Sequence, residues 1–176
     1  KREYSDHLYN QATFIGASCL LYKLTGETKY LTLATQGVNY SFMTMGTGTQ
    51  KYLPLETGYE QGVYAAIFAQ YIGMYLIDCG DDISASYHDK YIKLVINNLN
   101  AGWKNRNASG LSNGKFQTKL SDDAVVESYG GSGLPALMLM FPVDKLTSVS
   151  EVKTEAKATT AGIYQIDGKL VCQGAC

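Results

Sequence analysis

The segment LYNQATFIGASCLLYKLTGETKYL, residues 8–31, limits the folds open to this chain more than any other stretch of its sequence. Gly26 stands where glycine caps the C-terminus of a helix, and a second apolar run begins directly after it. The segment therefore predicts a buried helix, a tight turn and an antiparallel second helix. The residues with the helical spacing of three and four are Phe14, Ala17, Leu21 and Leu24.

The rest of the first 141 residues repeats this helix–turn–helix pattern. Gly130, Gly131 and Pro135 fit a helix interior badly, so we expect the last helical segment in two pieces or beginning near Ser132. Helical hairpins at intervals of roughly 50–60 residues are typical of a toroid or solenoid. The segments with helical periodicity are about 30–42, about 60–78, about 84–103 and a stretch within 122–141, with a Gly/Ser/Asn-rich loop at 107–115.

The character of the sequence changes at Pro142. A polar stretch with alternating Lys and Glu leads to GIYQIDGKLV, which predicts two short strands around the turn dipeptide Asp167-Gly168. We therefore expect two parts: residues 1–141, a helical domain, and residues 142–176, a tail that carries a short β-hairpin. Cys172 and Cys176 in the tail have a spacing that allows a small disulfide loop.

Composition excludes several classes of function. The 176 residues are 45% hydrophobic, as in a globular domain, and the formal net charge of −1 gives no electrostatic basis for binding nucleic acid. No apolar run approaches the ~18 residues of a transmembrane helix. Cys19 and Cys79 lie in apolar helical runs, where a free thiol acts as a small hydrophobic group. Neither of the two His residues lies at zinc-ligand spacing from a Cys, so we expect no metal site and no cofactor.

Three motifs in order resemble glycoside hydrolase family 76, the endo-α-1,6-mannanases. The first is YNQATFIGASCLLYKLTGETKYL, which departs from the family pattern at Ala12, where the family usually has Gly. In the second, GVYAAIFAQYIGMYL, Ala65 replaces a Lys and Gln70 replaces an Arg. The third is YIKLVINNLNAGWKNRN, similar to the family's helix end with Trp and Arg. Positions that agree in the first two motifs are Tyr9, Asn10, Gln11, Phe14, Ile15, Gly16, Ala17, Leu21, Tyr22, Thr25, Gly26, Tyr30, Leu31, Ile67, Phe68 and Tyr71.

This resemblance covers about residues 4–141 and implies an all-α (α/α)6 toroid of six inner and six outer helices. It implies that the chain holds about half of that toroid, the C-terminal half. The adjacent aspartates that form the family's catalytic pair would lie in the other half, so we expect no catalytic residue here. The tail resembles an ending common in secreted Bacteroidetes proteins, which implies a secreted, cell-surface or periplasmic location.

Residues near helix starts are the candidate substrate-binding residues. Asn10 and Gln11 offer both donors and acceptors to sugar hydroxyls, but they also suit pairing with each other or capping a helix. Glu56 and Glu60 can accept sugar hydroxyls, and as a pair can run general acid–base chemistry, but they also suit the positive end of a helix dipole, the interpretation we favour for Glu60. Tyr9, Tyr59 and Tyr129 are the tyrosines best placed to stack on a pyranose, whereas most others have the spacing of core residues.

Two acidic pairs favour structural roles. Asp122-Asp123 imitates the aspartate pair of the family but falls at the wrong place in the pattern, and we interpret it as the start of a helix. Asp81-Asp82 follows Gly80 between two helices and indicates a turn and cap rather than a metal site.

The predicted function is to form part of the cleft wall of a hydrolase that acts on α-mannan, with this chain inactive alone. The alternative is a non-catalytic carbohydrate-binding or surface protein on the same scaffold. A helical protein–protein interaction scaffold would explain the hairpins but not the ordered motifs. The expected partners are a mannan-like oligosaccharide or polysaccharide and either the missing N-terminal half or a second copy of the chain.

Overall fold

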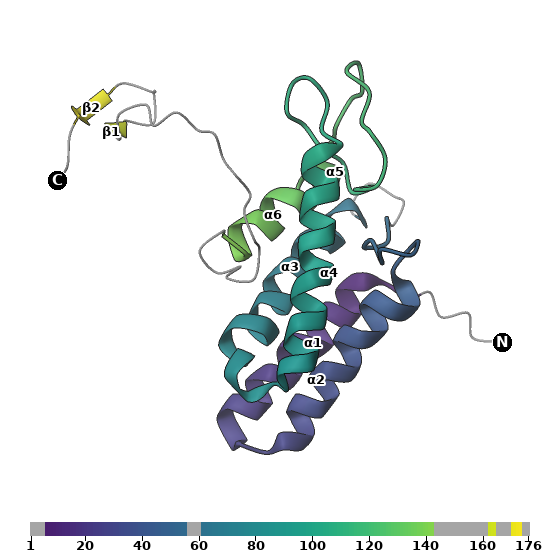
Figure 1. Cartoon of the computed structure of the whole chain (residues 1–176), viewed down its shortest axis with the longest axis vertical. Coiled ribbons are helices and arrows are strands. Elements are labelled where there is room, and N and C mark those ends of the chain that lie inside the picture. Colours follow the sequence, from purple (N-terminus) through teal and green to yellow (C-terminus); the bar gives the residue numbers. More distant parts are fainter. Residues whose placement is uncertain (1–5, 56–60, 143–161, 165–169, 174–176) are drawn as a thin grey trace. The chain divides into compact units, whose positions relative to one another are not determined.

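The computed structural model describes residues 6–55, 61–142, 162–164 and 170–173. Residues 1–146 and 147–176 form two separate compact units. The first unit is helical, and its helices run as successive hairpins along the length of the unit (Figure 1). Within the described residues, no helix is both long enough and apolar enough to cross a bilayer.

The first hairpin confirms the predicted pair of helices. Helix α1 (Leu8–Thr25) is followed by α2 (Thr28–Tyr40), which continues as one π-helical stretch, η1 (Ser41–Met45). Gly26 ends α1 with φ 70°, a left-handed conformation that side chains disfavour, and its N–H donates to the Tyr22 carbonyl.

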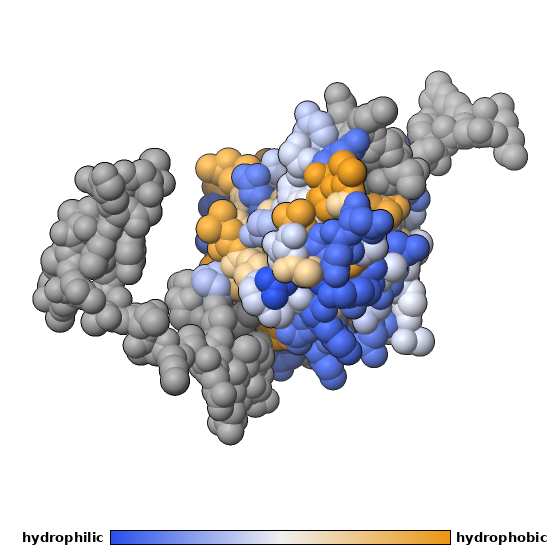
Figure 2. All heavy atoms as spheres, turned by 90° about the horizontal axis from the view of Figure 1, so that it is seen from above, coloured by the Kyte–Doolittle hydropathy of each residue, from blue (hydrophilic) through white to orange (hydrophobic). Residues whose placement is uncertain are grey.

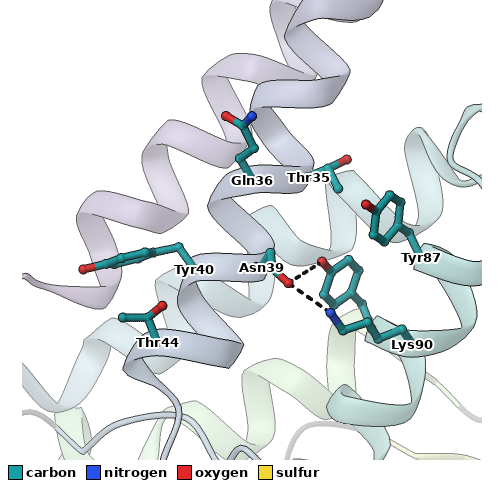
Figure 3. A pocket seen from close by; sticks show the side chains of 8 residues that line it. Thr35, Gln36, Asn39, Tyr40, Thr44, Tyr87 and Lys90 are labelled. Atoms are coloured by element: carbon teal, nitrogen blue, oxygen red, sulfur yellow. Dashed lines mark hydrogen bonds between the residues drawn. The ribbon is translucent and has the colours of Figure 1, made fainter.

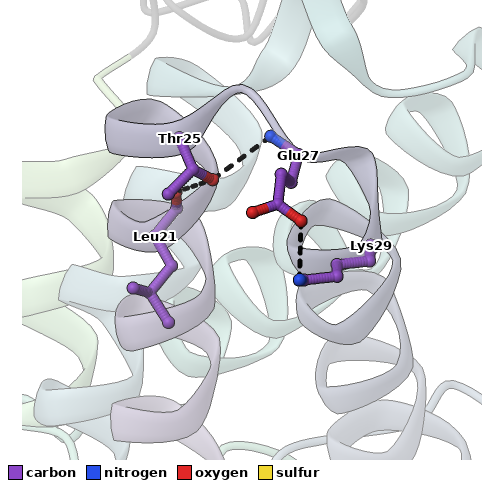
Figure 4. A network of polar contacts seen from close by, with 4 residues as sticks. All are labelled: Leu21, Thr25, Glu27 and Lys29. Atoms are coloured by element: carbon purple, nitrogen blue, oxygen red, sulfur yellow. Dashed lines mark hydrogen bonds and ion pairs between the residues drawn. The ribbon is translucent and has the colours of Figure 1, made fainter.

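The turn between the two helices is held by short-range polar contacts (Figure 4). The Thr25 hydroxyl donates to the Leu21 carbonyl at 2.7 Å and accepts the Glu27 N–H at 3.2 Å. Lys29 forms an exposed ion pair with Glu27 at 2.6 Å. These contacts fix where α1 ends and α2 begins.

The second hairpin also has its predicted place. A short 3-10 turn, η2 (Gln61–Val63), leads into α3 (Tyr64–Gly73), which ends in a π-helical stretch, η3 (Met74–Asp78). A further 3-10 turn, η4 (Gly80–Asp82), contains the predicted Asp81-Asp82 turn, and α4 (Ala85–Lys104) follows.

The last helical segment is in two pieces, as predicted. Helix α5 (Ser128–Gly131) and helix α6 (Gly133–Met140) meet at Ser132. Pro135 lies in the first turn of α6, where a helix needs no backbone N–H, so the proline is tolerated there. The predicted loop at 107–115 is part of a longer segment without helix or strand.

Aromatic rings form the centre of the helical core. Phe42 packs edge-on against Phe68 with ring centroids 5.5 Å apart and stacks on Tyr91 at 6.2 Å. Tyr75 meets Tyr91 edge-on at 6.1 Å, and its hydroxyl hydrogen-bonds the Thr35 hydroxyl at 2.8 Å. Burial raises the pKa of Tyr75 to about 12, because the phenolate would lose its hydration.

Helix α1 differs from the prediction on one face. Its buried residues face α2 and α3, but the predicted stripe lies on the opposite, exposed face. Phe14 is 43% exposed and Leu24 82% exposed. The periodicity is right for a helix, yet it does not identify the buried side, because α1 is apolar on both faces. The buried set is Leu8, Ala12, Ile15, Gly16, Ser18 and Cys19.

A buried amide fixes the connection between the first two hairpins. Asn98 on α4 is fully buried, and its Oδ1 accepts the Leu53 N–H at 2.8 Å. Its Nδ2 donates to the Lys51 carbonyl at 3.3 Å and to the Leu94 carbonyl at 2.8 Å. All of its polar atoms are thus used to hold residues 51–53 against α4.

The second unit contains two short strands. Strand β1 (Gly162–Tyr164) pairs antiparallel with β2 (Leu170–Gln173), with Ile163 opposite Cys172. The predicted turn at Asp167-Gly168 and residue Cys176 lie outside the described residues. The boundary predicted at residues 141 and 142 stays a prediction.

Candidate functional site

Three aromatic rings meet where α1 and α3 begin. The Tyr9 and Tyr64 ring centroids are 4.6 Å apart, and His7 lies 5.8 Å from Tyr9 and 5.6 Å from Tyr64. Since these residues stand at the starts of two helices that pack along each other, both helices begin at the same end of the unit. All three side chains are half-buried, so they form a partly exposed aromatic surface at that end.

Asn10 and Gln11 extend this surface with polar groups. Both lie in the first turn of α1, Asn10 exposed and Gln11 half-buried. Within the described part of the chain neither side chain makes a hydrogen bond, and the α1 N-cap, His7, makes no side-chain capping bond. The structural interpretation, in which the amides pair with each other or cap the helix, is therefore not what the structure has. The donors and the acceptor of each amide thus have no side-chain hydrogen-bond partner among the described residues.

Helix α5 lies at the same end of the unit, because its backbone comes close to that of η2. A Cβ atom on Gly62 would lie 2.7 Å from the Gly130 nitrogen, so η2 and α5 pack backbone to backbone. Only glycine at position 62 allows this contact. The approach places Tyr129, which is 46% exposed, beside the start of α3.

Three predicted site residues, Glu56, Tyr59 and Glu60, lie outside the described residues. Their assignment stays a prediction. Of the other three, Tyr9 is in the aromatic surface and Asn10 and Gln11 flank it on α1. His7 and Tyr64 were missed by sequence reasoning, although each is an aromatic residue at a predicted helix start, the same signal that identified Tyr9.

The Asp122-Asp123 interpretation was wrong. Helix α5 does not begin until Ser128, and the two aspartates lie in a turn of the preceding loop. Asp122 accepts the Ala108 N–H at 2.7 Å, and Asp123 accepts the Ser121 hydroxyl at 2.7 Å, which lowers the pKa of Asp123. Both carboxylates organise this loop. Across the residues that the structure describes, no three His, Cys, Asp or Glu side chains gather as a metal site.

Apart from the aromatic surface, a hollow lies between α2 and α4 (Figure 3). Its volume is about 370 Å³. Asn39 at its centre accepts hydrogen bonds from Lys90 at 3.0 Å and from the Tyr91 hydroxyl at 3.2 Å. The groups best able to bind a ligand there are thus engaged with one another. The other residues of the lining are Thr35, Gln36, Tyr40, Thr44 and Tyr87.

Another hollow, about 490 Å³, lies along α6 and the end of α4 and is mainly apolar. The Arg106 guanidinium covers the Trp103 ring at 3.1 Å on its rim. In the view from above, hydrophobic residues gather on one side of the helical unit and hydrophilic residues on the other (Figure 2). The apolar residues of this hollow are Trp103, Leu111, Val126, Leu134, Pro135, Met138 and Leu139.

Comparison with known proteins agrees with this helical architecture. Curated protein sequences give no match. A solved structure matches with a TM-score of 0.66 at 22% identity, over 81% of this chain and 40% of the other. That structure is an inactive variant of the α-1,6-mannanase of Salegentibacter sp. HEL1_6, with two aspartates changed to alanine, in complex with α-1,6-mannotetrose.

The likeness in structure shows that the helical unit has the fold of that mannanase, of which the chain spans about 40% of the length. The sequence profile of glycosyl hydrolase family 76 matches residues 3–150. This range includes all three motifs and both complete hairpins. The chain therefore belongs to glycosyl hydrolase family 76.

Proposed function

We propose that this chain forms part of the cleft wall of a glycoside hydrolase that acts on α-mannan. The observation that carries the proposal is the pair of unengaged amides, Asn10 and Gln11, beside the Tyr9–Tyr64 aromatic surface. Rings and amides in one place suit a sugar, since a pyranose has a flat apolar face and a rim of hydroxyls. The family match and the mannotetrose-bound relative support mannan as the class of substrate.

The catalytic step belongs, in this proposal, to the part of the (α/α)6 toroid outside this sequence. Among the described carboxylates, Asp6 is hydrogen-bonded by the Tyr40 hydroxyl, the Asp122–Asp123 pair holds a loop, and Glu127 directly precedes α5. This chain would supply about half of the toroid, with Tyr9, Asn10, Gln11, Glu56, Tyr59 and Glu60 on the cleft side. No cofactor is required, because glycoside hydrolysis needs two carboxyl groups and water.

The exposed flanks of the helical unit support an incomplete toroid. The exposed face of α1 and the apolar hollow along α6 lie at the two ends of the helix series. We propose that the remaining helices of the toroid cover them, or that a second copy of the chain does. We also propose a secreted, cell-surface or periplasmic location, which suits a polysaccharide substrate, and a Bacteroidetes source, which the sequence of the tail suggests.

Binding of α-1,6-mannotetrose to single variants tests the role in the cleft. Asn10→Ala and Gln11→Ala should each weaken binding severalfold and leave thermal stability nearly unchanged, because neither amide has a partner within the described chain. Gln36→Ala, an exposed amide in the α2–α4 hollow, is the matched control and should bind as the parent does. Unchanged affinity together with a large loss of stability would mean that the amides are structural.

A hydrolysis assay on α-1,6-mannan separates the two candidate functions. The chain alone should release no sugar, and adding the remaining helices of the toroid should produce activity if the whole is an enzyme. Binding that persists without any hydrolysis in the completed toroid would favour the alternative, a carbohydrate-binding or surface protein. Hydrolysis by this chain alone would overturn the assignment of catalysis to the other part.

A further inference from the structure

Two buried thiols lie together at the interface of α1 with the end of α3. Cys19 is on the buried face of α1, and Cys79 directly follows η3. Cys19 is 1% exposed, Cys79 is fully buried, and both are free thiols. Helix α1 packs against both α3 and η3, so residues 60 positions apart in sequence are brought to one point of the core.

The two thiols interact with each other. Each thiol is among the groups that shift the pKa of the other, so the two side chains are neighbours in the core. A thiol that serves only as a small hydrophobic group needs hydrocarbon neighbours and no second thiol. The pairing therefore calls for an explanation beyond the packing role predicted from sequence.

Two other uses of a thiol pair fit poorly. Metal binding would need further ligands, and no group of three His, Cys, Asp or Glu side chains exists in the described part of the chain. A reactive nucleophile would need a thiolate, but burial raises the pKa of the Cys19 thiol to about 12 and also raises that of Cys79. Asp78 raises the pKa of both thiols further, and the opposing effect of Lys23 is the smaller of the two at Cys19 and the larger at Cys79.

We propose that Cys19 and Cys79 are a disulfide site, oxidised by a low-molecular-weight disulfide such as oxidised glutathione. One protein thiolate attacks the glutathione disulfide, forms a mixed disulfide and releases one reduced glutathione. The other protein thiolate then attacks the protein sulfur of the mixed disulfide and displaces the second glutathione. The protein loses two electrons and two protons, and the glutathione disulfide gains them as two thiols.

The reaction belongs to folding rather than to the folded state. Both thiols are shielded from solvent in the native core, and their raised pKa values suppress the attacking thiolate. In the unfolded chain the thiols have ordinary pKa values and free access to the oxidant. The bond would fasten α1, whose other face is exposed, to α3. This inference is independent of the sugar that the cleft binds.

Refolding in a glutathione redox buffer tests the proposal. We would use the full chain with Cys172→Ser and Cys176→Ser, so that only the proposed pair can react, and refold the reduced, denatured protein with oxidised glutathione or with reductant. Proteolysis without reduction should yield a peptide pair joined through Cys19 and Cys79. The oxidised protein should melt about 10 °C higher than the reduced one, since the bond closes a long loop.

The matched control is Cys79→Ser in the same background, which should show no linked peptide and no redox-dependent shift in melting temperature. Recovery of both Cys19 and Cys79 as alkylated thiols after refolding with oxidised glutathione would overturn the proposal. So would a linked protein that melts lower than the reduced form. If a serine variant fails to fold, peptide mapping of the parent chain still decides whether Cys19 joins Cys79.

Discussion

Helices α1 and α3 are both apolar around much of their circumference, yet they meet different surroundings. Helix α3 packs between α1 on one side and α6 on the other, and Gln70 is the one residue exposed between Tyr64 and Gly73. Helix α1 has α2 and α3 on one side, and the described chain leaves its other side open. The same type of sequence thus gives an interior helix in one place and an edge helix in the other.

The difference shows what hydrophobic periodicity can predict. It indicates how much of the surface of a helix is apolar, but it does not identify the segments that cover that surface. An apolar patch of about 500 Å² is worth roughly 12 kcal/mol when it is covered, before entropy costs. That is comparable to the whole stability of a small domain, so an uncovered patch of that size marks a surface for association. The described chain leaves apolar side chains uncovered on the outer face of α1, at Phe14, Leu20, Leu21 and Leu24.

The strongest test of the contrast compares one phenylalanine on each helix. Phe68→Ala on α3 should lower the free energy of unfolding by about 3–5 kcal/mol, because Phe68 is fully buried against Phe42. Phe14→Ala on α1, whose side chain is 43% exposed and packs over Gly37 of α2, should lower it by only about 1–2 kcal/mol. Urea unfolding at low protein concentration measures both. Equal losses would mean that the Phe14 face is covered within the chain.

The dependence of stability on alkaline pH tests whether the groups on the buried side of α1 are shielded from solvent. The Cys19 and Tyr75 pKa values are raised from 9.0 and 10.0 to about 12 in the folded protein. Between those pH values the unfolded chain loses protons that the folded chain keeps, so stability should fall as pH rises from about 9 to 12. Each group contributes a slope of about 1.4 kcal/mol per pH unit.

Urea midpoints measured with reductant present give this slope. Cys19→Ala should remove the contribution of that thiol. A flat profile from pH 9 to 11 would show that the two groups are not buried as described.

Two neighbouring asparagines on α4 allow the same comparison of a buried with an exposed position, now for polar side chains. Asn98→Ala should cost about 1–3 kcal/mol of unfolding free energy, because buried backbone groups at residues 51–53 lose their partner. Asn97→Ala removes only an exposed bond to Gln50, 3.0 Å long, and should cost less than about 0.5 kcal/mol. Thermal unfolding of both variants is the measurement, and a reversed order would contradict the assignment of Asn98.

The smallest effect is expected at the turn between α1 and α2. Glu27→Gln removes the exposed ion pair with Lys29 and should change the free energy of unfolding by less than about 0.5 kcal/mol. High salt should make parent and variant indistinguishable, since the pair is open to solvent. A larger loss would indicate that this turn is packed against something other than water.

Sequence reasoning predicted the fold well where local signals decide. Gly26 ends the first helix and the Gly130–Pro135 region splits the last one, because both effects act on the backbone within a few residues. It failed where the answer depends on neighbours. The exposed stripe of α1 and the loop role of Asp122 depend on which segments come together in space, and periodicity does not carry that information.

The residues of the candidate site also differ in whether a local signal or the packing of distant segments identifies them. Tyr9, Asn10 and Gln11 were predicted as site residues because they begin a helix within a family motif, and their role in binding stays a prediction. His7 and Tyr64 join them only through the packing of α1 on α3, which brings residues more than 50 positions apart into ring contact. The Cys19–Cys79 pair has the same origin, and each cysteine alone predicts only a buried hydrophobic position.

Light scattering at low micromolar concentration tests the central claim, that the outer face of α1 and the apolar hollow along α6 are surfaces made to be covered. The chain has a mass of 19.2 kDa, and we predict a measured mass above that value. Replacing Leu20 and Leu24 on the exposed face of α1 with lysine should lower the measured mass, because charge would oppose burial of that face. A soluble, stable species of 19.2 kDa for the unaltered chain would contradict the account.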